Sequence, residues 1–317
     1  MFEFTAIYTM DSGHAAVEIL TTSPRQFVDF NEDRYGNLAI EDGQANDILA
    51  QVGALIKSDE GPLAGLAVRK MVLAGTSMSA GTLINYLPAH KVYRTPEMGH
   101  IYDGFMPTSA GQTIQEVDVP LIQMPTMHEA ETNVPRRQDS DEPGKQYRLY
   151  EVAGIGHVDG RDNVRTKPNP CAKPLSTFPH QAYMAVGLYH LFRWVDQGTP
   201  PPHADRLLLD RDVTNDGSMM ALDAHGNPLG GIRNPYVDVP IAKYGPVIAA
   251  IEPVIANPSA YVAANGRAGA DIMCRLSAYQ ESFPKTELRA LYGSKRSYER
   301  QFEARLDELE RVWFNLH

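Results

Sequence analysis

A short segment in the first third of the chain constrains the fold more than any other feature. Residues 70–74, Lys-Met-Val-Leu-Ala, form an apolar run that ends at a glycine, which predicts a short buried strand. The next residues, Gly75-Thr-Ser-Met-Ser-Ala-Gly81, are mostly small, and residues 79–87 then carry apolar side chains at helical spacing. A strand that turns sharply into a helix through small residues exposes the serine at the turn. We therefore expect an α/β protein with an exposed serine at this turn.

The alternation of strands and helices extends over the first two thirds of the chain. Apolar runs bounded by turn residues predict further strands, and apolar stripes at helical spacing predict two longer helices. This order predicts a mostly parallel sheet flanked by helices, because parallel neighbours need crossover connections. The strands are expected at 14–22, 100–107, 119–125 and 147–153, and the helices at 45–57 and 181–197.

The last third of the chain has a different character. Residues 207–245 hold short β-like pieces between glycine-containing turns, which predicts hairpins, and residues 246–270 predict a helix followed by a loop. Residues 295–315 carry one apolar stripe and predict a terminal helix. We expect a single domain over 1–317, in which 199–294 is a cap-like or packed C-terminal elaboration.

Composition excludes several classes of protein. The net charge of -10 disfavours nucleic acid as a partner, and no apolar run is long enough to predict a membrane span. No Cys-x-x-Cys pair indicates a metal site, and we expect no metal and no organic cofactor. Cys171 and Cys274, the two cysteines, could form one disulfide or remain reduced. The N-terminus shows no leader, which predicts a cytoplasmic protein or an exported one whose leader has been removed.

Ser77 is the expected nucleophile. It follows the predicted strand closely and has Gly75 two residues before it and Ser79 two residues after it, as a strained turn requires. The backbone N–H of Met78, at the start of the new helix, would donate to a developing oxyanion. Ser79 is the alternative nucleophile, because the residues around it also read small-x-Ser-x-Gly. We favour Ser77, since the strand ends at Ala74.

His157 is the expected general base. When a serine sits at such a turn, the acid and the histidine follow it in that order, on loops after later strands. His157 lies in Gly154-Ile-Gly-His, directly after the strand expected at 147–153, and would take the proton from the serine. The remaining candidates have poorer positions, close to the serine turn, inside a helix or before a strand: His14, His90, His100 and His190.

The acid that orients this histidine is expected after the strand at 119–125. Glu131 and Glu129 both lie there, and we favour Glu131, which precedes a short turn and Val-Pro. Glu129 is the alternative acid, and Asp103 is a third choice from the preceding strand. The sequence therefore predicts a Ser-His-Glu triad.

Six short segments carry a combined pattern: Asn31–Asn37, Gly75–Gly81, Tyr102–Phe105, Arg137–Asp141, Tyr150–His157 and Asn234–Pro240. Together they resemble one known family, the bacterial alpha/beta hydrolase domain-containing proteins. The similarity covers roughly residues 14–310. It implies an α/β-hydrolase fold, Ser77 and His157 in the triad, an acid from the 129–131 loop and the activity of an esterase-like serine hydrolase.

The N-terminus departs from that family pattern. Members of the family carry several strands before the one expected at 14–22, so this chain looks shortened there. Those strands carry the second oxyanion donor, which here would come from residues 1–13, from neighbouring segments or from a partner subunit. A shortened sheet would also expose an edge, which makes a homodimer a reasonable hypothesis.

The sequence thus predicts a serine-dependent hydrolase of the carboxylesterase type, acting through an acyl-enzyme. Its substrate would be a small-molecule or polymeric ester. The alternative is a catalytically weak or inactive scaffold that acts as a binding or assembly protein, because loss of one oxyanion donor lowers the rate by about 10²–10³.

Overall fold

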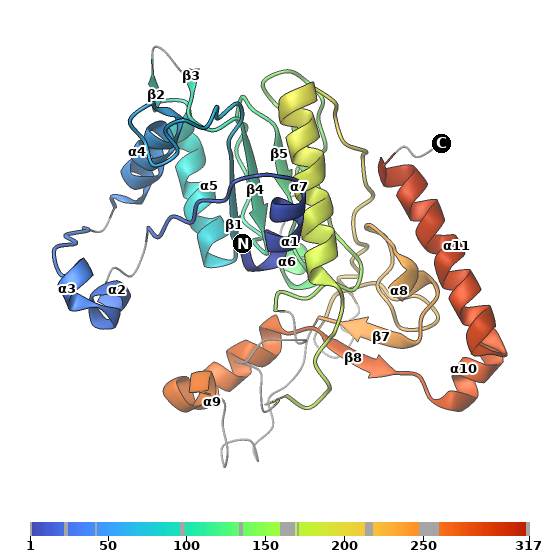
Figure 1. Cartoon of the computed structure of the whole chain (residues 1–317). Coiled ribbons are helices and arrows are strands. Elements are labelled where there is room, and N and C mark those ends of the chain that lie inside the picture. The colour runs from blue at the N-terminus through green and yellow to red at the C-terminus, as the bar shows by residue number, and fades with distance from the viewer. Residues whose placement is uncertain are drawn as a thin grey trace. The chain divides into compact units, whose positions relative to one another are not determined.

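The computed structural model divides into two compact units (Figure 1). It describes residues 2–21, 25–41, 43–95, 99–132, 136–158, 169, 171–212, 218–246 and 260–314. Compact units can belong to one domain, so the single domain and its elaboration at 199–294 stay predictions. Unit 1 comprises Met1–Gln123, Gln138–Tyr147 and Met184–Pro200, and unit 2 comprises Met124–Arg137, Arg148–Tyr183 and Pro201–His317.

Unit 1 contains the parallel strands and the helices around them. The chain passes from unit 1 to unit 2 within β6 (Tyr147–Leu149), and α7 (His180–Gln197) lies mostly in unit 1. The other elements of unit 1 are α1 (Phe2–Asp11), α2 (Arg25–Phe30), α3 (Glu32–Tyr35), α4 (Ala45–Lys57), β1 (Val72–Thr76), α5 (Met78–His90), β2 (Arg94–Thr95), β3 (Gly99–His100), β4 (Gly104–Thr108) and β5 (Leu121–Gln123).

The main sheet has four strands in the order β1-β4-β5-β6. Strand β1 pairs with β4 in parallel, in a register that runs from Val72 opposite Gly104 to Thr76 opposite Thr108. Strand β4 also pairs in parallel with β5. The prediction of a mostly parallel sheet flanked by helices is therefore confirmed. Strands β4, β5 and β6 are shorter than the apolar runs that predicted them, and β1 ends at Thr76 rather than at Ala74.

Helices cover both faces of β4. Successive residues of a strand point to opposite faces of the sheet. A Cβ on Gly104 would lie 2.7 Å from Val195 of α7, so this face meets α7 closely. The next residue, Phe105, is fully buried and its ring lies 6.3 Å from the ring of Tyr86 on α5. The sheet is thus sandwiched between α5 and α7 (Figure 1).

The prediction of a strand at 14–22 was wrong for its described part. Residues 14–21 form no strand, and helix α1 precedes them instead. Val17 and Leu20 are each 44% exposed, so their apolar side chains do not belong to the core. A β pattern becomes a strand only where a neighbouring strand offers hydrogen bonds, and no described strand pairs with this segment.

Unit 2 has little regular sheet. The hairpins predicted in 207–245 occur as isolated antiparallel bridges, such as Leu209 opposite Met220 and Leu222 opposite Pro228. Of the helix followed by a loop that was predicted for 246–270, residues 247–259 lie outside the described ranges, and the helix α9 covers residues 260–276. The elements of this unit are α6 (Met127–Thr132), α8 (Pro235–Asp238), β7 (Ala242–Gly245), α9 (Ala260–Leu276), β8 (Tyr279–Ser282), α10 (Lys285–Tyr292) and α11 (Lys295–Phe314).

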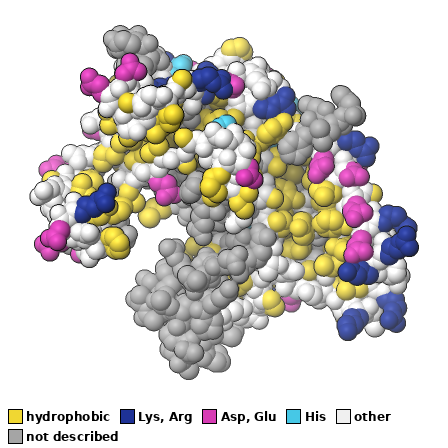
Figure 2. All heavy atoms as spheres, viewed as in Figure 1, with side chains coloured by type: hydrophobic (Ala, Val, Ile, Leu, Met, Phe, Trp, Pro, Cys, Tyr) yellow, Lys and Arg dark blue, Asp and Glu magenta, His cyan; other side chains and the backbone are white. Residues whose placement is uncertain are grey.

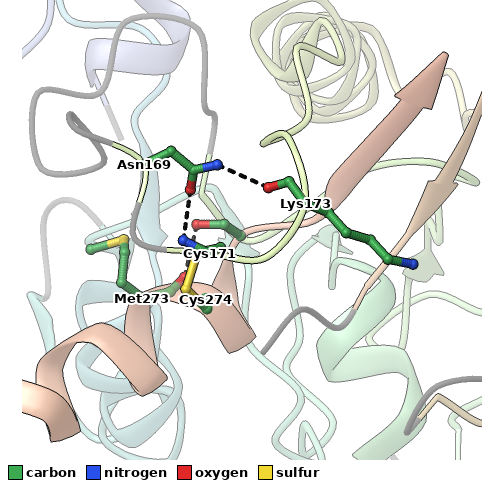
Figure 3. The surroundings of a disulfide bond; sticks show 6 residues. Asn169, Cys171, Lys173, Met273 and Cys274 are labelled. Atoms are coloured by element: carbon green, nitrogen blue, oxygen red, sulfur yellow. Dashed lines mark hydrogen bonds between the residues drawn. A yellow bond between two sulfur atoms is a disulfide. The ribbon is translucent and has the colours of Figure 1, made fainter. Parts of the chain in front are cut away.

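A disulfide joins Cys171 to Cys274 near the C-terminal end of α9 (Figure 3). The side chain of Asn169 accepts a hydrogen bond from the Cys171 N–H and donates one to the carbonyl of Lys173. The bridge is buried and packs against Tyr279 of β8. The structure thus has the disulfide rather than two reduced thiols.

Helix α11 closes the described part of the chain, as the apolar stripe at 295–315 predicts. Acidic and basic side chains are mixed along its exposed face (Figure 2). One of its arginines, Arg305, reaches Asp238, which also pairs with Arg233. Among the helices of the described ranges, none combines the length and the apolarity needed to cross a bilayer.

Candidate active site

Ser77 lies at the turn between β1 and α5, with a backbone conformation that side chains rarely adopt. Its φ is 57° and its ψ is -121°. The turn is held by hydrogen bonds from the Ser77 N–H to the Thr108 carbonyl and from the Gly81 N–H to the Ser77 carbonyl, both 3.0 Å long. A positive φ at a residue other than glycine stores strain and is common at functional sites. This conformation is the one that a nucleophile elbow requires.

The residues around Ser77 explain why the turn needs small side chains. A Cβ on Gly75 would lie 2.6 Å from the Ser79 carbonyl oxygen and 2.9 Å from the Ala80 nitrogen, both backbone atoms that cannot move aside. Ser79 lies inside α5, so the strained turn position belongs to Ser77. Met78 begins the helix, and the side chain of the N-cap residue, Ser77, makes no capping hydrogen bond. The first N–H groups of a helix have no partner within it, which leaves this end suited to an oxyanion.

His157 lies in unit 2, on the loop after β6. Its backbone N–H and that of Val158 both donate to the Leu276 carbonyl, over 3.1 and 3.2 Å. Two glycines shape the approach to the histidine. Gly154 has a φ of 97°, and a Cβ on Gly156 would lie 2.6 Å from the Ala278 side chain. The glycine-bracketed loop therefore packs closely against the segment that follows α9.

Glu129 holds the imidazole of His157. One carboxylate oxygen of Glu129 bonds Nδ1 of His157. The other oxygen accepts hydrogen bonds from the backbone N–H of Thr126, at 2.9 Å, and from its hydroxyl. Burial raises the pKa of Glu129, but the bonds from His157 and Thr126 outweigh burial and leave this pKa below its ordinary value. Glu129 is therefore an ionised, buried partner of the imidazole.

The local sequence explains this pairing. Thr126 precedes α6 and Glu129 is three residues further on, which is the spacing of a capping box. The carboxylate at that position turns back toward the start of the helix. The start of α6 lies beside the histidine loop, because the Met127 N–H donates to the Ile155 carbonyl. We did not identify Thr126 from the sequence, although the Thr-x-x-Glu pattern marked it.

Glu131, the acid that we favoured from the sequence, makes different bonds. Its carboxylate accepts hydrogen bonds from the Ser218 hydroxyl and from the Met219 N–H, the latter over 2.9 Å. Residues two apart on a helix do not share a face, so Glu129 and Glu131 point to different surroundings. The structure thus pairs the imidazole with the alternative acid, Glu129, and not with the favoured one.

The third choice of acid and the remaining histidines occupy other places. Asp103 pairs with Lys57 at 2.9 Å and accepts from the Met71 N–H, at the opposite end of β1 from Ser77. His14 stacks on Phe192. His90 and His100 lie together near the N-terminal ends of the strands.

The predicted serine and the predicted histidine lie in different units. Unit 1 presents a strained serine between a parallel strand and a helix, and unit 2 presents a histidine held by a buried carboxylate. These features define an α/β protein of the hydrolase type.

The particular family follows from the sequence. The chain matches the family model described as alpha/beta hydrolase domain over residues 2–314, and it belongs to this family. No curated protein and no solved structure matches the chain. The family expected from the motifs is therefore confirmed, whereas its bacterial origin and the shortened N-terminus stay predictions.

Proposed function

We propose that this protein is a serine hydrolase that cleaves carboxylic esters through an acyl-enzyme. Ser77 Oγ attacks the ester carbonyl while His157 takes the hydroxyl proton and then passes it to the leaving alcohol. Glu129 keeps the proton on Nδ1, so that the base is the lone pair of Nε2. A water molecule then releases the acid from Ser77 by the same steps.

One observation carries this proposal. In a member of a hydrolase family, the histidine that the chain order predicts as the base has its Nδ1 held by a buried carboxylate. That partner fixes the tautomer and stabilises the imidazolium that forms during attack. A loop histidine without catalytic work needs no such ionised and buried partner.

The backbone supplies the proposed oxyanion donors. The Met78 N–H opens α5 directly after Ser77, where the helix dipole also favours negative charge. A second donor would come from residues before β1. We propose a small-molecule or polymeric ester as substrate, because the proposed steps require only an acyl carbonyl and a leaving alcohol.

A fluorophosphonate probe tests the nucleophile. We expect wild-type protein to be labelled on Ser77, Ser77→Ala to lose the label, and the matched control Ser79→Ala to keep it. With p-nitrophenyl esters, Ser77→Ala should lower kcat by on the order of 10⁶, as in a comparable triad enzyme. Labelling that is lost in Ser79→Ala instead would move the nucleophile. A folded wild type that is neither labelled nor active would favour the binding or assembly scaffold.

We also infer that the protein works in an oxidising compartment. Disulfides form and persist in secreted and periplasmic proteins and are rare in the cytosol. Of the two compartments that the sequence left open, the Cys171–Cys274 disulfide supports the exported one. Alkylation of thiols in freshly lysed cells, followed by mass spectrometry, tests this inference, and two free thiols in the native protein would overturn it.

A further inference from the structure

Three side chains of types that commonly ligate metals lie close together in unit 1, at the edge of the sheet opposite Ser77. His90 ends α5, His100 ends β3, and Asp118 lies in the loop before β5. Each offers one ligand atom, and these atoms all lie within 4.8 Å of one another. Ser77 follows the C-terminal end of β1, whereas His100 and Asp118 precede β4 and β5. In a parallel sheet the two positions are at opposite edges.

The buried imidazole of His90 is short of hydrogen bonds. Its side chain has no exposed surface, and in the described part of the chain neither ring nitrogen makes a hydrogen bond. The same holds for Oδ1 of Asp118, which lies 3.5 Å from Nε2 of His90. A buried polar atom without a partner costs free energy, so this arrangement calls for an explanation.

The separation of these two atoms suits a metal better than a hydrogen bond. An N–H···O bond is about 2.9 Å long. Two ligands of a tetrahedral zinc ion, each about 2.0–2.1 Å from the metal, lie about 3.3 Å apart. The observed 3.5 Å between His90 Nε2 and Asp118 Oδ1 is close to that edge.

We propose that His90, His100 and Asp118 form a binding site for a divalent transition metal of the zinc type. Two imidazoles and one carboxylate are a zinc donor set, with the fourth position left for water. This inference does not rest on the proposed esterase activity.

Arg94 competes with the metal for these ligands. Its guanidinium lies 2.9 Å from Nδ1 of His100 and also bonds the carboxylate of Asp118. A neutral imidazole cannot accept from Arg94 at one nitrogen and bind a metal at the other without losing its last proton, so Arg94 must withdraw first. Its side chain is 35% exposed and also lines a surface pocket beside Asp47, which gives it room to move.

The expected effect of the metal is on the stability of unit 1. It would tie the end of α5 to β3 and to the loop before β5, and thus fix the edge of the sheet that lies away from the nucleophile. Binding of a metal to the folded state alone raises stability. We therefore expect zinc to change the melting temperature and to leave the labelling of Ser77 unchanged.

Zinc binding to the metal-stripped full chain is the direct test. In competition with a chromophoric chelator, wild type should bind one Zn²⁺ per chain. His100→Gln and Asp118→Asn should each weaken binding at least ~10-fold, the loss seen even when an outer partner of a ligand is removed. Arg94→Ala should bind Zn²⁺ more tightly than wild type. His203→Gln, which changes an exposed histidine outside the cluster, is the matched control and should bind like wild type.

Two further readouts keep the test decisive if a variant folds poorly. Zn²⁺ should raise the melting temperature of wild type and not that of His100→Gln, and Co²⁺ should give the visible absorption of a four-coordinate site. Equal binding by wild type, His100→Gln and Asp118→Asn would mean an adventitious ion only and would overturn the proposal. So would the absence of one-to-one binding. If Arg94→Ala binds Zn²⁺ no more tightly than wild type, the proposal that Arg94 competes with the metal is wrong.

Discussion

Unit 1 holds Ser77 in place by different interactions from those by which unit 2 holds His157. In unit 1 the position of Ser77 is set by the backbone, through paired parallel strands and a strained turn with a φ of 57°. In unit 2 the position of His157 is set by bonds from elsewhere, namely the Glu129 carboxylate and the Leu276 carbonyl. Unit 2 also depends on a disulfide and on partly buried ion pairs such as Arg233 with Asp223.

This difference predicts which kind of substitution disturbs each unit most. A sheet that ends in a close-packed turn should tolerate polar substitutions. It should not tolerate an extra atom at a point where two backbone segments are in contact. A loop held by a few polar bonds is sensitive to the loss of one donor or acceptor, because the partner is then left buried without a bond. Substitutions matched within each unit can therefore separate steric control from control by polar bonds.

Among the substitutions that compare the ways in which the two units hold these residues, Glu129→Gln is expected to have the largest effect. The amide can no longer stabilise an imidazolium and favours the wrong tautomer of His157, so kcat for ester hydrolysis should fall by about 10⁴. The pH–rate profile should change as well, because the carboxylate no longer holds the base. Steady-state kinetics with a p-nitrophenyl ester measure both effects.

Glu131→Gln is the matched control. A glutamine oxygen can still accept the bonds from Ser218 and Met219, so activity should stay within a few-fold of wild type. If Glu131→Gln abolished activity while Glu129→Gln retained it, Glu131 would be the acid and the assignment of Glu129 would fail.

The disulfide should give the next largest effect. Replacing Cys171 and Cys274 together by alanine opens a link between residues that are 103 positions apart. Removing a native disulfide ordinarily costs about 2–5 kcal/mol. We expect the urea midpoint of wild type to fall on reduction, and the double variant to show no further response to reductant. A double variant as stable as oxidised wild type would show that polar bonds alone hold this part of unit 2.

The predictions from the sequence were most accurate where the structure depends on residues that are close together in the chain. Helix α4 has the predicted bounds, 45–57, because its apolar stripe and its ends are local features. The turn at Ser77 was also local. The segment 14–22 was predicted wrongly because a strand depends on a partner that its own residues do not specify.

The candidate site was harder to predict for a related reason. Glu129 and Glu131 differ only in the face of a short helix that each occupies, and the start of that helix decides the face. The capping pattern from Thr126 to Glu129 favours Glu129, whereas the prediction relied on the short turn and Val-Pro that follow Glu131. The pairing of the two cysteines and the meeting of His90 with Asp118 depend on distant parts of the chain, which spacing does not reveal.

A steric change at the elbow tests the other half of the comparison. Gly75→Ala adds a Cβ 2.6 Å from the Ser79 carbonyl oxygen and should destabilise unit 1 by about 1–3 kcal/mol, as overpacking does elsewhere. Labelling of Ser77 should slow as the turn shifts. The control is Gly81→Ala, whose Cβ would meet only the end of the Gln112 side chain at 3.5 Å. Since alanine favours a helix interior, Gly81→Ala should leave stability unchanged or raise it. Equal loss in both variants would contradict steric control at Gly75.

The smallest effect concerns the hydroxyl of Thr126 and depends on pH. The pKa of Glu129 is lower in the folded protein than in the unfolded chain, so its ionised form stabilises the fold above the ordinary glutamate range. That stability is lost as the pH falls through the folded pKa. Thr126→Val removes one donor to the carboxylate and should raise this pKa, lowering the free energy of unfolding near neutral pH by about 1 kcal/mol. Thr126→Ser keeps the hydroxyl and should follow wild type from pH 7 down to acid unfolding. If the valine and serine variants gave the same curve, the hydroxyl would contribute nothing to holding Glu129, and the backbone N–H of residue 126 would be the donor that matters.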